Sequence, residues 1–159
     1  MVAGLAARIS EIGVIAAEHA AAGDAERRLA DPVVTALRDA GLFAALVPES
    51  LGGLELEPQI FLDAVRALAA DDAAAAWVVA VCGTGGMLAA YLEPSTAAEI
   101  YNGGAIAAGV FAPRGRAVRD GDELVVDGRW SFASGCAHAD WLMVGCRRRR
   151  CRAHASRRR

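Results

Sequence analysis

The spacing of apolar residues changes at Asn102-Gly103-Gly104, and this change limits the folds that the chain can adopt. Upstream, apolar side chains recur every three or four residues, which is the spacing of an α-helix with one buried face. Downstream, apolar and polar residues alternate, as in a half-buried β-strand. The pattern therefore predicts about 100 residues of helices and then the first strands of a β domain, so the chain is mainly α.

Five helical segments are predicted before this change. They cover residues 5–22, 32–40, 57–70, 73–82 (broken at 83–86 and continuing as 87–92) and 95–101. Asp31 is placed to cap the second helix ahead of Pro32, and Asp71 or Asp72 to cap the fourth. Residues 73–82 are apolar on nearly all sides, so we expect this helix to be central and buried.

Strands are predicted after the change. They cover residues 105–111, a hairpin of residues 116–119 and 123–132 around Asp120-Gly121-Asp122, and residues 140–145. An Asp-Gly pair is favoured in tight hairpin turns, which supports the turn at this position. Leu124, Val126 and Trp130 alternate along the second hairpin strand, as expected for side chains that share one face.

The composition changes abruptly after Cys146. Residues 147–159 contain eight of the 17 basic residues, all arginine, whereas residues 1–146 hold nine arginines and all 19 acidic residues, a net charge of −10. The arginine-rich tail has three interpretations: a segment that binds nucleic acid or another anion, a solvated charge run, or out-of-frame translation. Every apolar residue except Ala and Cys disappears in mid-strand, which favours the third interpretation and predicts a disordered tail after a truncated β domain.

The chain accordingly divides into a helical domain at residues 1–103, an incomplete β domain at residues 104–146 and the tail at residues 147–159. A β domain that stops after its first strands has open edges and an unburied face. We therefore expect the β part to be unstable by itself, whereas the helical part can fold as a compact unit.

The cysteines and the N-terminus indicate a cytoplasmic protein. Cys82, Cys136, Cys146 and Cys151 show no paired spacing, so free thiols in a reducing compartment are expected. Acidic residues interrupt the N-terminal apolar stretch, which does not have the form of a signal peptide. No uncharged apolar run reaches the ~18 residues that a membrane span requires, so no membrane association is expected. The Cys and His spacings fit no common zinc framework, and no metal ligand is assigned.

Three segments, taken in order, resemble the acyl-CoA dehydrogenase superfamily. The first is GLFAALVPESLGGLE at Gly41–Glu55, which resembles the family's Pro-x-x-x-Gly-Gly loop between early helices. The second is AGVFAPRGRA at Ala108–Ala117, in the place of the first strand of the β domain. The third is VVDGRWSFASGCAHADWLMVGC at Val125–Cys146, which is similar to the aromatic-x-Ser-Gly strand of the superfamily's flavin-dependent monooxygenases.

The resemblance implies the N-terminal helical domain of the acyl-CoA dehydrogenase fold, followed by the first strands of its β-barrel domain. It also implies a flavin, either FAD or reduced FMN, against the β domain. On this alignment Phe132 supplies a flat face or an edge to the flavin ring, and Ala133 and Ser134 border it. Ser134 would offer a hydroxyl or backbone group near flavin N5 and the C4 carbonyl. Val110 and Phe111 fall on the family's other flavin-facing strand.

The activity implied by the resemblance is that of a two-component hydroxylase. Such an enzyme takes reduced flavin from a separate flavin reductase and uses oxygen to hydroxylate an aromatic or polyketide-like substrate. The family forms homotetramers, which we do not expect of this chain. No catalytic residue is assigned, because the rest of the β domain and the C-terminal helical domain have no counterpart here. We therefore expect little or no activity from these 159 residues alone.

Two other functions stay open on the sequence alone. The first is an acyl-CoA dehydrogenase that acts on an acyl substrate. Phe111-Ala112 stands where dehydrogenases usually have Thr-Glu, and Gly115-Arg116-Ala117 where they have Gly-Ser-Asp, which counts against it. The second is a small helical interaction or nucleic-acid-binding protein that acts through the arginine-rich tail. The monooxygenases also often have a histidine near the position of Gly85, which this chain lacks.

Overall fold

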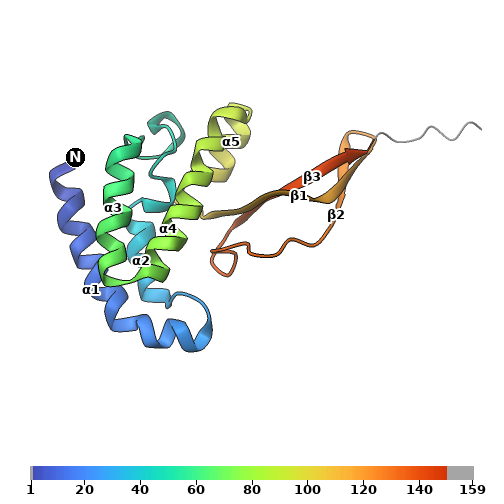
Figure 1. The fold of residues 1–159 in the computed structure, drawn as a ribbon. Helices are drawn as coiled ribbons and strands as arrows, with labels where there is room; N and C mark the ends of the chain where they lie inside the picture. The colour runs from blue at the N-terminus through green and yellow to red at the C-terminus, as the bar shows by residue number, and fades with distance from the viewer. Residues whose placement is uncertain (1, 150–159) are drawn as a thin grey trace, which may run out of the picture. The chain divides into compact units, whose positions relative to one another are not determined.

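The computed structural model describes residues 2–149, and its helices and strands follow the predicted order (Figure 1). The described chain forms two compact units. Unit 1 comprises the residues up to Gly109 together with Ser134–Leu142, and unit 2 comprises Val110–Ala133 and the residues from Met143 onward. All the helices lie in unit 1, which confirms the predicted mainly α fold. The domain boundaries at residues 103 and 146 stay a prediction.

Unit 1 is built on helices that pack side by side. They are α1 (Val2–Glu26), α2 (Asp31–Asp39), α3 (Pro58–Asp71), α4 (Ala73–Gly85) and α5 (Pro94–Tyr101), with the short 3-10 helices η1 (Leu42–Ala44), η2 (Glu49–Leu51) and η3 (Gly86–Tyr91). Helix α3 packs between α1 and α4, as Figure 1 shows in blue and green. The predicted irregular path between α2 and α3 contains η1 and η2, and residues Leu42–Ala45 of this path are buried.

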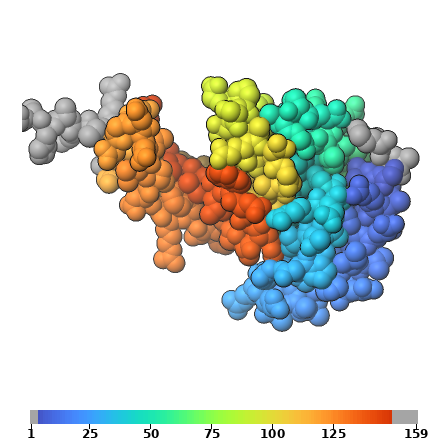
Figure 2. All heavy atoms as spheres, turned by 180° about the vertical axis from the view of Figure 1, so that it is seen from behind, coloured from blue at the N-terminus to red at the C-terminus, as the bar shows by residue number. Residues whose placement is uncertain are grey.

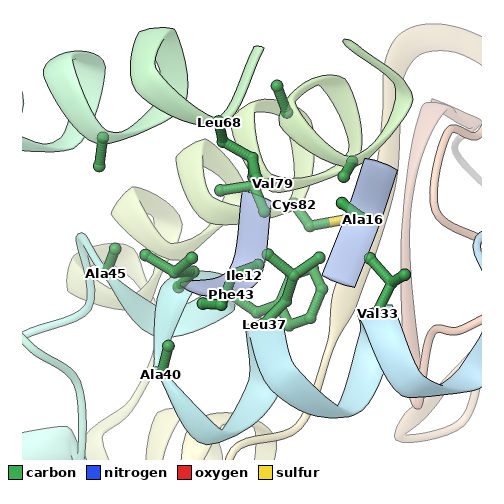
Figure 3. Close-up of a cluster of buried hydrophobic side chains, with 14 of the residues drawn as sticks. Ile12, Ala16, Val33, Leu37, Ala40, Phe43, Ala45, Leu68, Val79 and Cys82 are labelled. Atoms are coloured by element: carbon green, nitrogen blue, oxygen red, sulfur yellow. The ribbon is translucent and has the colours of Figure 1, made fainter. Parts of the chain in front are cut away.

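The core of unit 1 joins apolar side chains from four helices. Figure 3 shows Ile12 and Ala16 of α1, Leu37 of α2, Leu68 of α3 and Val79 of α4 converging, and all five are buried. Burying one such aliphatic side chain contributes about 1.5–3 kcal/mol. Among the described residues no polar or charged side chain is buried, and the core also includes apolar residues outside the α-helices, such as Phe43 and Ile106.

The helix ends confirm one predicted cap and correct another. Asp72 caps α4, because its side chain accepts a hydrogen bond of 2.6 Å from the backbone N–H of Ala75. Asp31 does not cap α2: the N-cap is Ala30, and Asp31 lies within the first turn, where its carboxylate pairs with Arg28. The acidic residue still lies at the positive end of the helix dipole, which is a favourable position for it.

Helix α4 is longer and more open than predicted. It continues through Gly83 to Gly85. Gly83 permits a close approach to α3, since a Cβ there would lie 2.8 Å from the Phe61 ring. One face is not covered, and the Trp77 side chain is 61% exposed. The expectation that no apolar run is long enough to cross a membrane was wrong: of the described residues, Ala73–Tyr91 has the length and composition, a test that the core helices of soluble proteins also pass. Burial of one face of α4 in the core accounts for much of this apolar character.

The strands form one three-stranded sheet with the order β2-β1-β3. Its strands are β1 (Ala107–Asp120), β2 (Glu123–Asp127) and β3 (Trp141–Arg149). The hairpin turn is where it was predicted, since β1 and β2 pair antiparallel with Asp120 opposite Glu123. The predicted strands 105–111 and 116–119 are one continuous strand, and β2 ends at Asp127 instead of Phe132. Strand β3 runs to Arg149, past the predicted end at Gly145; the remaining tail, 150–159, lies outside the described residues.

Candidate functional site

Ser134 is the predicted flavin neighbour that lies in unit 1. Its hydroxyl oxygen accepts a hydrogen bond of 3.1 Å from the indole Nε1 of Trp77, on the open face of α4. An indole can only donate, so the hydroxyl hydrogen of Ser134 stays free to donate to another group. The predictions did not include Trp77. Helix 73–82 is apolar on nearly all sides, so the spacing of its apolar residues does not indicate which of them is exposed.

The segment Ser134–Leu142 is attached to the rest of unit 1 at three further points, of which one, Arg38, lies in a helix. The Nε2 atom of His138 accepts a hydrogen bond of 3.2 Å from the backbone N–H of Leu29. One carboxylate oxygen of Asp140 accepts from the backbone N–H of Ile106 at 2.8 Å and from Arg38 at 3.2 Å. Figure 2 shows this segment in deep orange beside the cyan surface of α2. These contacts place Ser134 relative to α4.

His138 is held in its neutral form. Burial lowers the pKa of its imidazole, and the nearby positive charges of Arg28 and Arg38 add to this, against the opposing effect of Asp31. A neutral ring nitrogen can accept the Leu29 hydrogen bond, whereas a protonated one cannot. The histidine therefore has a structural role, which is to hold this segment against the start of α2.

The turn after Ser134 requires a glycine. Gly135 has a left-handed φ of +81°, and a Cβ there would lie 2.6 Å from the sulfur of Cys82 on α4. The same sulfur lies 3.9 Å from the carbonyl oxygen of Ser134. The turn thus packs directly on α4, which is possible because residue 135 has no side chain.

The other four predicted flavin neighbours lie in unit 2. Phe111 on β1 is 65% exposed, Val110 and Ala133 are half-buried, and Phe132 is 97% exposed. Phe132 is not in a strand as predicted: β2 ends before it, and its φ is +63°, which is uncommon for a bulky residue. An aromatic ring this exposed is not a core residue of the described chain.

The contacts of Trp130 give it a packing role in unit 2. Its indole donates a 2.8 Å hydrogen bond to the carbonyl of Gly145 on β3 and packs over Gly115 of β1.

No metal site is found in the part of the chain that the structure describes: within residues 2–149 no group of three or more His, Cys, Asp or Glu side chains could hold a metal ion. Cys151 and His154 lie outside the described residues.

Sequence comparison places the chain beside bacterial flavin-dependent monooxygenases, although no protein-family model matches it. It is 33% identical over 130 residues to the flavin-dependent monooxygenase oxygenase subunit HsaA of Mycobacterium tuberculosis, covering 80% of this chain and 33% of that protein. It is 34% identical over 136 residues to an indole-3-acetate monooxygenase of Acinetobacter baumannii, covering 80% of this chain and 34% of the relative. The chain thus spans about a third of the length of these relatives.

Solved structures give the same result for the fold. The M. tuberculosis HsaA monooxygenase superposes with a TM-score of 0.85 at 31% identity, over 94% of this chain and 40% of that one. XiaF from Streptomyces sp., crystallised with FADH2 and glycerol, superposes with a TM-score of 0.89 at 29% identity, over 94% of this chain and 38% of that one.

These findings first define the class: the chain has the N-terminal helical region and first strands of the acyl-CoA dehydrogenase-like fold. They then define the branch, because about 80% of the chain is similar to flavin-dependent monooxygenases, among them the oxygenase subunit HsaA. The predicted resemblance is confirmed in both respects. The relatives are monooxygenases and hydroxylases, which favours this branch over the dehydrogenase alternative.

Proposed function

We propose that this chain provides the flavin-facing N-terminal part of an oxygenase component that hydroxylates an aromatic substrate with reduced flavin and oxygen. The observation that carries the proposal is the Ser134 hydroxyl, which Trp77 holds by its oxygen while its hydrogen is free to donate. Two relatives are described as oxygenase components of hydroxylases, of p-hydroxyphenylacetate and of resorcinol.

The residues present suit a flavin, which needs an apolar wall and a few directed hydrogen bonds. Phe111 and Phe132 offer exposed aromatic rings, and Val110 and Ala133 add half-buried apolar surface. Ser134 offers a hydroxyl donor to N5 or to the C4 carbonyl. Reduced FMN or FAD would supply the electrons that activate oxygen, and this chain's own residues would orient the ring and exclude water from one side of it.

Partners and compartment follow from the same proposal. A two-component system requires a separate flavin reductase, and a cytoplasmic location suits both components and the free thiols of the described cysteines.

A homotetramer is expected of the full-length oxygenases. We do not propose it for these 159 residues alone, nor do we expect them to turn over substrate. Leu124, Val125 and Val126 of β2 are all about half exposed, so the sheet does not enclose a dry pocket by itself.

A chimera tests the proposal. Residues 1–146 would replace the matching N-terminal third of the M. tuberculosis oxygenase subunit, and binding of reduced flavin and hydroxylation would be measured with a flavin reductase. We expect Ser134→Ala to weaken reduced-flavin binding about five- to tenfold, the effect of one lost hydrogen bond. Ser131→Ala, three residues upstream and exposed, is the matched control and should change nothing.

Two results would contradict the proposal. One is a folded chimera whose affinity for reduced flavin is the same with and without the Ser134→Ala substitution. The other is a folded chimera that binds no flavin. The 159-residue chain alone is assayed in parallel, and stoichiometric flavin binding with turnover would show that our expectation of inactivity is wrong.

A further inference from the structure

Two cysteines lie close to the Ser134–Gly135 peptide, one in space and one in sequence. Cys82 is buried on α4, and its sulfur is 3.9 Å from the Ser134 carbonyl oxygen and 2.6 Å from where a Cβ of Gly135 would lie. Cys136 is the next residue, and it is exposed. Gly135 is the residue whose backbone lies beside the Cys82 sulfur. The Cα of Cys136 is about 3.8 Å from the Cα of Gly135, because the two residues are consecutive.

The two thiols differ in their surroundings. The pKa of Cys82 is raised to about 11, mainly by burial and also by the charge of a Cys136 thiolate. In the reduced protein Cys82 is therefore a protonated thiol, which reacts more slowly with an oxidant than a thiolate does. Cys136 is open to solvent, so an oxidant reaches it first.

The backbone at Gly135 approaches the Cys82 sulfur closely. A disulfide requires Cα atoms within about 7 Å and correctly directed Cβ atoms. Gly135 has no side chain to separate the turn from α4, and its neighbour Cys136 lies in a turn closed by one hydrogen bond, from the His138 N–H to the Gly135 carbonyl at 3.0 Å. A bond between the two sulfurs would require a rotation about this turn, which lies outside the helices.

We propose that Cys82 and Cys136 form a reversible disulfide when the protein meets hydrogen peroxide. The Cys136 thiolate attacks one peroxide oxygen; an S–O bond forms, the O–O bond breaks, and the departing hydroxide takes a proton to become water. The Cys82 sulfur then attacks the Cys136 sulfur; the S–S bond forms, the S–O bond breaks, and the Cys82 proton leaves with the hydroxide as a second water. Two thiols are oxidised and one peroxide is reduced to two waters.

The consequence is a covalent tie between α4 and the segment that carries Ser134. In the reduced protein Ser134 is attached to α4 through the Trp77 hydrogen bond and the packing of Gly135. The disulfide would add a link two residues from Ser134 and would restrict its movement. This inference rests on the thiols alone and does not depend on the proposed function.

The test uses the whole chain with Cys146→Ser and Cys151→Ser, so that Cys82 and Cys136 are the remaining cysteines. The folded protein is treated with hydrogen peroxide, quenched in acid, alkylated and digested with trypsin. Cleavage after arginine places Cys82 in the peptide of residues 67–114 and Cys136 in the peptide of residues 130–147. We expect these two peptides to be joined, with the loss of two hydrogen masses, and to separate on adding dithiothreitol.

Three controls make the result decisive. Pairing should be at least tenfold faster in the native protein than in guanidinium chloride, and equal rates would overturn the proposal. In Cys82→Ala, Cys136 should instead proceed to sulfinic acid or link two chains. The proposal is wrong if Cys136 of the parent protein also proceeds to sulfinic acid or links two chains, and if Cys82 can still be alkylated after unfolding. Circular dichroism of each variant confirms that the helices are intact.

Discussion

Unit 1 and unit 2 differ in where their apolar side chains lie. In unit 1, four helices bury a continuous cluster around Leu37, Leu68 and Val79. In the described part of unit 2, Ala117 is the one buried apolar residue, while Leu124, Val125 and Val126 of β2 are about half exposed. The comparison teaches that the helices have a core of their own, whereas the sheet relies on strand pairing. A small sheet needs a covered apolar face for independent stability.

The largest expected effect is on the free energy of unfolding, and it compares a core residue of unit 1 with a half-exposed residue of unit 2. Leu37→Ala should lower the free energy of unfolding by about 2–5 kcal/mol, because it leaves a cavity among four helices. Val126→Ala, at a half-exposed position of β2, should change it by less than about 0.5 kcal/mol. Urea unfolding followed by the helical circular dichroism signal measures both. Equal losses would show that the two units share one core.

A smaller effect concerns the close approach of α3 and α4. Gly83→Ala should cost about 1–3 kcal/mol, because the new methyl group would lie 2.8 Å from the Phe61 ring. Gly4→Ala is the control: nothing lies within 4 Å of its Cβ position, and alanine favours helix by up to about 1 kcal/mol. The same urea titration compares them. A stabilising Gly83→Ala would mean that the two helices pack less closely than described.

The cap of α4 should have an effect near 1 kcal/mol. Asp72→Ala removes the acceptor for the Ala75 N–H and should cost about 0.5–2 kcal/mol. Asp63→Ala, which removes an exposed carboxylate near Arg66, should cost less than about 0.5 kcal/mol. If thermal unfolding shows the two variants to be alike, the Asp72 cap does not form in solution.

The smallest expected effect is a pH dependence confined to unit 1. The pKa of His138 is lowered in the folded state, so its contribution to stability is present above the unfolded value of about 6.5 and is lost as pH falls through the folded value. The urea midpoint should therefore fall as the pH is lowered from about 7.5 to about 5.5. His138→Gln keeps an acceptor for the Leu29 N–H without titrating, and should reduce this fall. If the urea midpoint of the variant depends on pH as in the parent protein, His138 is not the source of this pH dependence.

The candidate site shows which predictions a sequence pattern can support. The aromatic-x-Ser-Gly motif singles out Ser134 as a predicted flavin neighbour, and the order of the strands along the chain and the turn at Gly121 also follow from the pattern. The contact from Trp77 was missed because it joins residues 57 positions apart. The extended strand expected at Phe132 was wrong: β2 ends early, and the chain folds back so that Trp130 reaches Gly145.

The sequence by itself determined the order of elements, the buried faces of the helices and the family resemblance, because these depend on local periodicity and on short motifs. The tertiary structure decided which face of α4 stays open, which aspartate caps which helix, and how Ser134 is held beside Trp77 and Cys82. Helix α4 is apolar on nearly all sides, so its periodicity has no preferred face. Packing against α3 and η1, and against the turn at Gly135, selects the side that is buried.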